Sequence, residues 1–367
     1  MRVPFFDLKS QYALIQNEVD EAHRAIFSAA QFVGGESVHT FENQFAKKLG
    51  VSHCISVGNG TDALFVALKA AGIGPGDEVI TPAWSWISSS ETISLTGAQP
   101  VFADADDFFT IDPIDVERRI TPRTKAIVVV HLYGQPANMD ALVAMCQKRN
   151  LTLIEDCAQA HFSEYKNQMA GTFGQLAAFS FYPTKNLGAY GDGGAVVTNN
   201  SSLAEKTRRF ANHGGLSKDD HQIEGINSRL DTLQAAYLTV KLNHIDAWTR
   251  KRIANAELYT ELLKGVGDIV TPEVRRSSKH TFHLYVIQTK KRDALKAYLQ
   301  GEGVETLVHY PKALPFEPAY HSLSFSEKDF PRAAQFQREV LSLPIYPELT
   351  REQIQFVCDR IQQFYGR

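Results

Sequence analysis

One stretch of the sequence, Leu151–His161 (LTLIEDCAQAH), places an acidic side chain directly after an apolar run. Asp156 would leave a buried strand at a point where desolvating a carboxylate is costly. An aspartate in that place could be a helix N-cap. No Arg or Lys stands nearby in the sequence to make it half of a structural ion pair. A buried carboxylate also suits one chemical task, which is to hold a proton on a heterocyclic nitrogen.

A second stretch, Phe179–Gly194 (FSFYPTKNLGAYGDGG), carries a lysine between an aromatic run and a glycine-rich loop. Most lysines are solvated surface residues, and that explanation of Lys185 stays open. Its polar and aromatic neighbours favour a pocket, in which a lysine can lose its proton and form a Schiff base. These neighbours are Ser180, Tyr182, Thr184 and Asn186. The glycines would let the backbone approach a ligand closely, although they also fit a flexible turn.

A third feature is the turn Gly58-Asn59-Gly60-Thr61, which follows an apolar run and precedes a helical pattern. Free backbone N–H groups and the helix dipole make such a turn suitable for a phosphate. The turn contains neither the dinucleotide fingerprint nor a P-loop lysine, so nicotinamide and ATP sites lose support. Thr61 acting as a plain N-cap is an equally good explanation.

Trp84 and Trp86 lie in the loop after the run that ends at Pro82. A tryptophan there most often belongs to the core, but a flat ring at the end of a strand can also stack on a flat cofactor. One molecule explains all these features together. Pyridoxal 5′-phosphate has an aldehyde for the lysine, a pyridine nitrogen for the aspartate, a phosphate for the glycine turn and a π-face for the tryptophan.

The elements that must position these residues alternate between strands and helices from about residue 50 to residue 200. The predicted strands are His53–Val57, Glu78–Ile80, Pro100–Phe102, Ala126–His131 and Leu151–Glu155, and the helices are Thr61–Ala71 and Trp86 to about Thr96. Nearly continuous apolar strands separated by helices indicate a parallel sheet that is covered on both faces. Ligands bind beyond the carboxyl ends of such strands. Gly58–Thr61, Pro82–Trp86 and Asp156–Gln159 all lie there.

The remainder of the chain predicts long helices over residues 229–265 and a smaller α+β part. Its elements are a strand at Phe282–Gln288 and helices at Arg292–Gly301 and Arg351–Tyr365. We expect a cofactor-binding large domain at residues 1–248 and a small C-terminal domain at residues 249–367, with a cleft between them.

Composition excludes several classes of protein. No window of about 18 apolar residues is present, which argues against a membrane-spanning helix, and the start MRVPFFDLKSQY turns polar too early for a secretory signal. A net charge of −3 gives no general attraction to nucleic acid or to an anionic membrane. The four cysteines are scattered without zinc spacing, so we expect no metal site and reduced thiols in a cytoplasm.

The chain resembles the nucleotide-sugar aminotransferase family (DegT/DnrJ/StrS class) of fold type I pyridoxal-phosphate enzymes over essentially its whole length. The resemblance is carried by PFFDL, GNGTDAL, GPGDEVITPAWSW, TPRTKAI, LIEDCAQAH, SFYPTKNLGAYGDGGA, NSRLDTLQAA and HYPKALPFEPAY. It implies an aspartate-aminotransferase-like α/β fold with a mostly parallel sheet. It also implies Lys185 as the Schiff-base lysine and Asp156 as the partner of the pyridine nitrogen. The other implied cofactor contacts are Gln159 at the ring hydroxyl, Trp86 on the ring face, and Gly60, Thr61 and Ser180 at the phosphate.

The resemblance further implies a homodimer with shared active sites, because Asn227 would reach the phosphate bound to a second subunit. Residues that fall where such enzymes hold the sugar are Tyr190, His213, Arg229, His309 and Tyr310. Taken alone, Asn227 could cap a helix that begins near Arg229, and the HYP stretch could be a turn that packs Tyr310. Pro4–Tyr12 is expected to pack against the body or the partner, without a chemical role.

The implied activity is transfer of an amino group from L-glutamate to a keto nucleotide sugar, with Lys185 moving the proton. Lysine at 185 argues against the relatives that carry histidine there and catalyse dehydration. YPTKNLGAYGDGGA followed by HYP resembles the members that aminate C3, with C4 amination as the alternative. A dTDP-6-deoxyhexose and a UDP-linked hexose such as an N-acetylhexuronate both fit, for amino-sugar or surface-polysaccharide (O-antigen, lipopolysaccharide) biosynthesis. Competing hypotheses are another pyridoxal-phosphate reaction, such as a desulfurase, and a cofactor-binding regulator that does not turn over.

Overall fold

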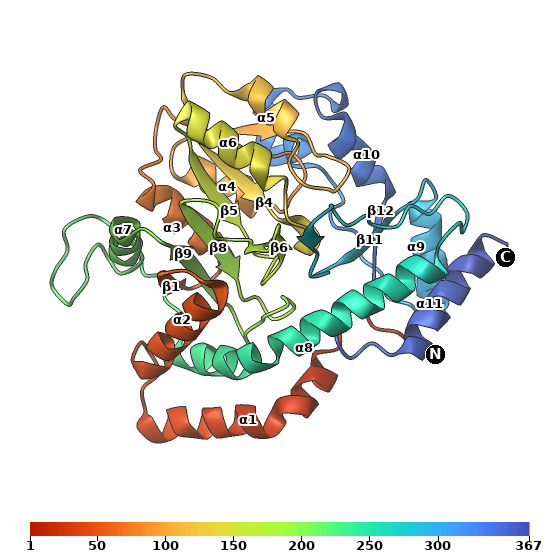
Figure 1. Ribbon diagram of the computed structural model, residues 1–367, viewed down its shortest axis with the longest axis horizontal. Coiled ribbons are helices and arrows are strands. Elements are labelled where there is room, and N and C mark those ends of the chain that lie inside the picture. The colour runs from red at the N-terminus through yellow and green to blue at the C-terminus, as the bar shows by residue number, and fades with distance from the viewer. Residues whose placement is uncertain (367) are drawn as a thin grey trace.

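The computed structural model of the protein describes residues 1–366, and a seven-stranded sheet forms its centre (Figure 1). The strand order is β1-β9-β8-β5-β4-β2-β3. The strands are β1 (His53–Val57), β2 (Glu78–Pro82), β3 (Gln99–Ala103), β4 (Thr124–Val130), β5 (Thr152–Asp156), β8 (Leu176–Ser180) and β9 (Gly194–Thr198). All neighbouring pairs are parallel except those of β9, which runs antiparallel to β1 and to β8. The predicted mostly parallel sheet is therefore confirmed.

Both faces of the sheet are covered by helices. Successive residues of a strand point to opposite faces, and β4 shows the result. Ile127 and Val129 pack with α6 residues such as Leu142, whereas Val128 packs with α3 residues such as Leu68. The helices of this part are α1 (Leu8–Ala29), α2 (Glu36–Leu49), α3 (Gly60–Ala70), α4 (Ser88–Leu95), α5 (Pro113–Arg119), α6 (Met139–Arg149) and α7 (Ser201–Ala211). Burial on both faces explains why these strands are continuous apolar runs.

One long helix, α8 (Thr232–Leu262), connects the sheet to the C-terminal part, where the sequence predicted several helices (Figure 1). Trp248 of α8 belongs to the same core cluster as α1 and α2. Ala256 and Tyr259 belong instead to the core of the C-terminal elements. Because the core cluster that α8 packs against changes after Trp248, we propose that the domain boundary lies near residue 248. The helix itself continues through this boundary.

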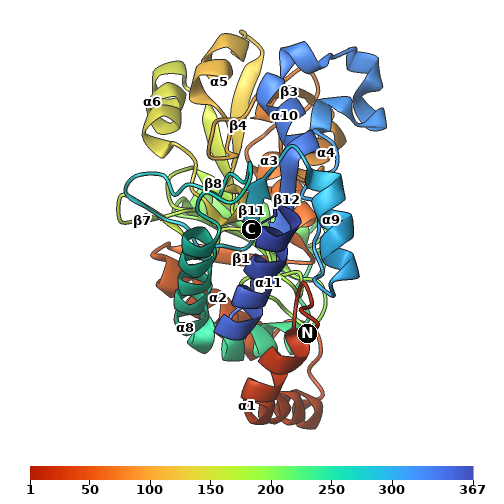
Figure 2. The same ribbon diagram turned by 90° about the vertical axis from the view of Figure 1, so that its right-hand side faces the viewer.

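The C-terminal part is built on a two-stranded antiparallel sheet of β11 (Tyr285–Gln288) and β12 (Val340–Leu343). Its helices are α9 (Arg292–Gly301), α10 (Pro331–Glu339) and α11 (Arg351–Phe364), with 3-10 turns at Leu314–Phe316, Pro318–Leu323 and Glu327–Asp329. Another 3-10 turn, Leu132–Gly134, follows β4, and β6 (Glu164–Tyr165), β7 (Gln168–Met169) and β10 (Ser278–Lys279) form a small sheet. The first residues of the chain lie against this part (Figure 2), where Val3 forms a parallel β-bridge with Val304. Over residues 1–366, no helix is both long and apolar enough to cross a membrane.

A buried carboxylate fixes the loop that joins β7 to β8. Glu155 of β5 is fully buried and accepts hydrogen bonds from the backbone N–H groups of Gly171, Phe173 and Gly174, each at 2.7 Å. The His131 Nε2 lies 2.9 Å from it, and its Nδ1 accepts from the Ala137 N–H, so Nε2 carries the proton and donates. With its oxygens engaged in this way, the carboxylate acts as a structural anchor beside Asp156.

We expect Glu155→Ala to lower the free energy of unfolding by about 4 kcal/mol, because four buried donors lose their acceptor. Urea denaturation of the two proteins measures this difference. Glu164→Ala is the matched control, since Glu164 forms only a partly exposed ion pair with Lys279 and should cost less than about 1 kcal/mol. Equal losses in the two variants would contradict the anchoring role.

Candidate active site

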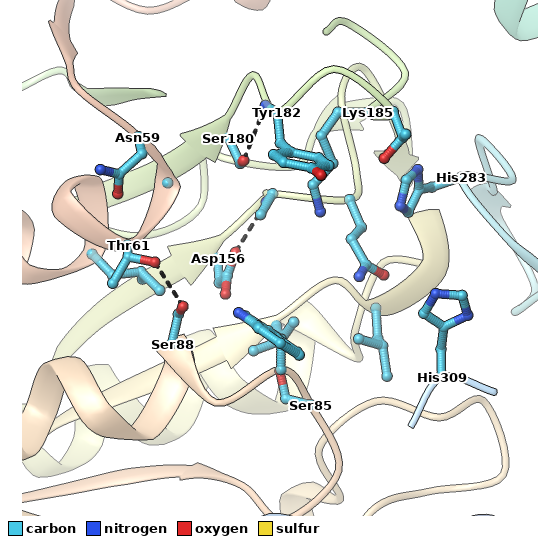
Figure 3. Close-up of a pocket in the computed structure, with 18 of the residues that line it drawn as sticks. Asn59, Thr61, Ser85, Ser88, Asp156, Ser180, Tyr182, Lys185, His283 and His309 are labelled. Atoms are coloured by element: carbon cyan, nitrogen blue, oxygen red, sulfur yellow. Dashed lines mark hydrogen bonds between the residues drawn. The ribbon is translucent and has the colours of Figure 1, made fainter. Parts of the chain in front are cut away.

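A cavity of about 750 Å³ lies at the carboxyl ends of the central strands, where the sequence placed the site (Figure 3). Its walls come from the N-terminal segment, the turn after β1, the loop after β2, the ends of β4 and β5, the loop after β8 and the C-terminal part. The lining residues are Phe6, Asn59, Gly60, Thr61, Leu64, Ser85, Trp86, Ser88, Val130, Leu132, Asp156, Ala158, Gln159, Ser180, Tyr182, Thr184, Lys185, Asp192, His283, His309 and Tyr310. The structure therefore brings together Lys185, Asp156 and every cofactor contact predicted within one chain.

Lys185 is presented by a tight turn after β8. Its backbone N–H donates to the Tyr182 carbonyl at 2.8 Å, and the Ala189 N–H returns to the Phe181 carbonyl at 2.7 Å. From α8, the buried Lys241 supports the same loop by donating to the Gly188 carbonyl at 2.7 Å. Desolvation lowers the pKa of Lys185 to about 8, partly opposed by the negative charge of Asp156. The interpretation of Lys185 as an ordinary surface residue is therefore wrong.

A lysine with this pKa is a nucleophile near neutral pH. In the cofactor-free protein, the fraction of Lys185 in the neutral form increases as pH rises through about 8. The rate at which an amine-reactive reagent modifies Lys185 should therefore rise with pH, with a midpoint near 8. Peptide mass spectrometry over pH 6 to 11 measures the rate, with the exposed Lys47 peptide as an internal reference for the reagent. A midpoint near the ordinary lysine value of 10.5 would contradict the burial effect.

Asp156 is the last residue of β5, and no helix begins at it, so the N-cap explanation is wrong. Its Oδ1 accepts from the Ala158 N–H at 3.0 Å. Within residues 1–366, Oδ2 accepts no hydrogen bond, which leaves an acceptor for a ligand. Burial raises the pKa of Asp156, and the Ala158 N–H, Lys185 and His131 each oppose that rise. Such a carboxylate shares a proton readily with a basic nitrogen.

The turn after β1 forms a close-fitting cradle for an anion. Asn59 caps α3 by accepting from the Asp62 N–H at 2.8 Å, so Thr61 is not the N-cap. The Thr61 hydroxyl instead lies 2.7 Å from the Ser88 hydroxyl (Figure 3). A side chain at Gly60 would place its Cβ 2.5 Å from the Ser180 Cβ. Only glycine therefore allows the first turn of α3 and Ser180 to lie together.

The two tryptophans have different environments. Trp84 is fully buried and donates to the Tyr133 hydroxyl at 2.9 Å, as a core residue does. Trp86 is 58% exposed and lines the cavity, where its ring is available to a ligand. Gln159 also lines the cavity, but its amide accepts from the Tyr133 N–H and donates to the Tyr310 hydroxyl. Its contact with a ring hydroxyl stays a prediction.

Four predicted residues do not line this cavity. His213, Asn227 and Arg229 are exposed, in the loop between α7 and α8 that projects from the body (Figure 1). Asn227 forms a bridge with Asn212, and the N-cap of α8 is Asp231, so Asn227 is not that cap. Tyr190 lines a separate pocket with Tyr12 and Tyr237. Roles for these four residues stay predictions.

Sequence reasoning gave no role to several residues that line the cavity, above all Phe6 and His283. Phe6 belongs to a segment that was expected only to pack, and His283 belongs to a predicted strand. No local signal marks either one, because only the tertiary fold brings them to Lys185.

The imidazoles of His309 and His161 are neutral at physiological pH. Desolvation lowers the pKa of His309 to about 4 and that of His161 to about 3, and Lys185 adds to both effects.

These residues fit pyridoxal 5′-phosphate. An amine of lowered pKa, a buried carboxylate with a free oxygen, a glycine cradle at a helix N-terminus and an exposed indole ring share one cavity. Lys185 would bind the aldehyde, Asp156 the pyridine nitrogen, and Gly60, Thr61 and Ser180 the phosphate.

Comparison with known proteins agrees with this site. A model of the DegT/DnrJ/EryC1/StrS aminotransferase family matches residues 13–362. The pleiotropic regulatory protein of Geobacillus stearothermophilus is 45% identical, over 100% of this chain and 99% of its own. The dTDP-3-amino-3,4,6-trideoxy-alpha-D-glucose transaminase of Streptomyces venezuelae is 43% identical, over 100% of this chain and 97% of its own. The crystal structure of S. venezuelae DesV in complex with a ketimine intermediate superposes with a TM-score of 0.98 at 43% identity, covering 100% of this chain and 99% of that one.

Proposed function

The chain belongs to the DegT/DnrJ/EryC1/StrS aminotransferase family, and from that premise we propose that it transfers the amino group of L-glutamate to C3 of a keto sugar linked to a nucleotide. The enzyme has the fold type I architecture and is a pyridoxal-phosphate-dependent sugar aminotransferase. When bound, pyridoxal 5′-phosphate supplies an aldehyde that exchanges amines and a ring that withdraws electrons.

The observation that carries the proposal is that Lys185 and Asp156 line the same cavity. Lys185, with a pKa of about 8, can hold or release a proton at neutral pH, as a general acid and base must. Asp156, whose Oδ1 accepts from the Ala158 N–H, would hold a proton on the pyridine nitrogen. Gly60, Thr61 and Ser180 would hold the phosphate in the cradle.

C3 is favoured over C4 by the resemblance of the Lys185 segment and by the 43% identical transaminase, which is named for a 3-amino sugar. The substrate is either a dTDP-6-deoxyhexose or a UDP-linked hexose. Either one would serve amino-sugar or surface-polysaccharide biosynthesis. A desulfurase requires a mobile, reactive cysteine. Cys157 is fully buried and its desolvation raises the pKa of its thiol, which argues against that reaction.

The name of the regulatory relative keeps a non-catalytic regulator as the second candidate. Adding L-glutamate to the holoenzyme separates the two. An aminotransferase changes the absorbance of its cofactor and releases 2-oxoglutarate, while a silent regulator does neither. A panel of 3-amino and 4-amino sugar nucleotides, run in the reverse direction, then identifies the sugar. We place the enzyme in the cytoplasm, supported by its four buried and unpaired cysteines.

We also propose a homodimer in which Asn227 completes the partner's phosphate site. Lys185→Ala and Asn227→Ala should each be impaired as homodimers. Unfolded together and refolded, they should regain about a quarter of the wild-type activity, because half of the dimers are mixed and each mixed dimer has one intact site. If the mixture is no more active than the separate variants, both residues serve the same chain.

A further inference from the structure

One wall of the active-site cavity comes from the N-terminal strap, residues 3–7. Phe6 lines the cavity together with His309 and Tyr310 of the C-terminal part. Its neighbour Phe5 is only 4% exposed and belongs to the core, while Phe6 is half-buried. The chain bends at Phe5, and both rings lie against the same core cluster. Phe5 is enclosed by that cluster, whereas Phe6 keeps part of its ring toward the cavity.

The strap is held on the C-terminal part by several contacts. The Val3 N–H donates to the Gly303 carbonyl at 2.9 Å, and the Glu305 N–H donates to the Val3 carbonyl at 3.0 Å. The Phe5 N–H donates to the Glu305 carboxylate at 3.2 Å. After the strap, Asp7 caps α1 by accepting from the Ser10 N–H at 3.0 Å. Phe6 is fixed on both sides, so its ring is placed before any ligand enters.

The ring also lies beside residues that face the ligand. Phe5 stacks on the His309 imidazole, with centroids 5.9 Å apart and planes 26° apart, and meets Phe6 edge-on at 4.6 Å. Phe6 packs against the core cluster that contains Tyr310, so the Phe6 wall continues the surface of His309 and Tyr310. Its position suits a ligand that extends past Lys185 toward the C-terminal part.

The chemistry of the wall favours one of the two substrates. L-glutamate carries two carboxylates, and placing a carboxylate against a phenyl ring removes water from it without supplying a hydrogen bond. A hexose offers C–H groups on its ring faces, which pack well on an aromatic surface. The cavity of about 750 Å³ is within the range of sites that enclose a ligand larger than an amino acid.

We propose that Phe6 is a specificity-determining residue that packs against the uncharged face of the sugar and takes no part in the reaction with glutamate. This inference rests on the proposed function. It gives the N-terminal strap a role in substrate selection, which its sequence alone did not predict.

The test measures the two halves of the reaction separately in Phe6→Ala, Phe6→Leu and the wild-type holoenzyme. For the nucleotide-linked 3-amino sugar that reacts with the wild type, Phe6→Ala should raise KM by roughly tenfold, because an apolar contact is lost. The rate with L-glutamate, followed by cofactor absorbance, should stay within about twofold. Phe6→Leu should recover most of the loss in KM, since leucine keeps an apolar wall.

Phe316→Ala is the matched control. Phe316 is a half-buried phenylalanine packed against the same core cluster, but it does not line the cavity. It should leave both half-reactions unchanged. An equal fall in the glutamate and sugar half-reactions of Phe6→Ala would reduce Phe6 to a structural residue and overturn the proposal, as would an unchanged KM for the sugar. A wild type that reacts with glutamate but with no sugar nucleotide would overturn the proposed function and this inference with it.

Discussion

Lys185→Ala should lower turnover by at least about 10⁴-fold, because in the proposed reaction this one side chain both binds the cofactor covalently and moves the proton. Lys185 is the lysine of the cavity, and its desolvated amine has a pKa of about 8. Alanine leaves space but no nucleophile and no base. Borohydride reduction followed by mass spectrometry should attach the cofactor to Lys185 in the wild type and to no residue in the variant.

Lys185→Arg is the informative companion. Arginine keeps the positive charge but cannot form a Schiff base or release a proton near neutral pH. It should retain noncovalent cofactor binding, through the cradle of Gly60 and Ser180, while turnover stays as low as in Lys185→Ala. Turnover within tenfold of the wild type in either variant would require another residue to act as the base.

Asp156→Asn should lower turnover by about 10³-fold, which is the cost of removing one electrostatic contact that strengthens in the transition state. The amide has nearly the same shape and can still accept from the Ala158 N–H, so the fold should be preserved. It cannot hold a proton on the pyridine nitrogen. Single-turnover kinetics with glutamate measure the loss, and cofactor affinity should fall much less than the rate.

Asp104→Asn provides the control for that substitution. Asp104 is also a buried aspartate at the end of a central strand, but its oxygens accept from the N–H groups of Arg332 and Ala333 outside the cavity. Its variant should lose stability and keep its rate per folded molecule. A similar loss of rate in both variants would mean that Asp156 acts only through the fold.

The central sheet and its ligand edge could be predicted from the sequence, because both follow from local patterns. The apolar run before Asp156 indicated β5, and the glycine turn after His53–Val57 indicated the start of α3. The different environments of Trp84 and Trp86 could not be predicted. Residues two apart point the same way in a regular strand, but the chain bends at 83–85 and separates them.

Contacts between distant segments were the other limit. Phe6 and His283 reach the cavity only after the N-terminal strap and the C-terminal part have packed against the sheet. The single helix α8 was predicted as several, because its buried face changes partner along its length and no single apolar stripe persists. Asn227 and Arg229 are exposed on the single chain, so no contact within that chain tests the roles predicted for them.

The most direct test of the proposed reaction is to follow ¹⁵N from labelled L-glutamate into the sugar by NMR, with the holoenzyme and a 3-keto nucleotide sugar. We expect one ¹⁵N-labelled amine, bonded to C3, and one equivalent of 2-oxoglutarate. Release of 2-oxoglutarate without any label in the sugar, or no transfer of the label at all, would contradict the account.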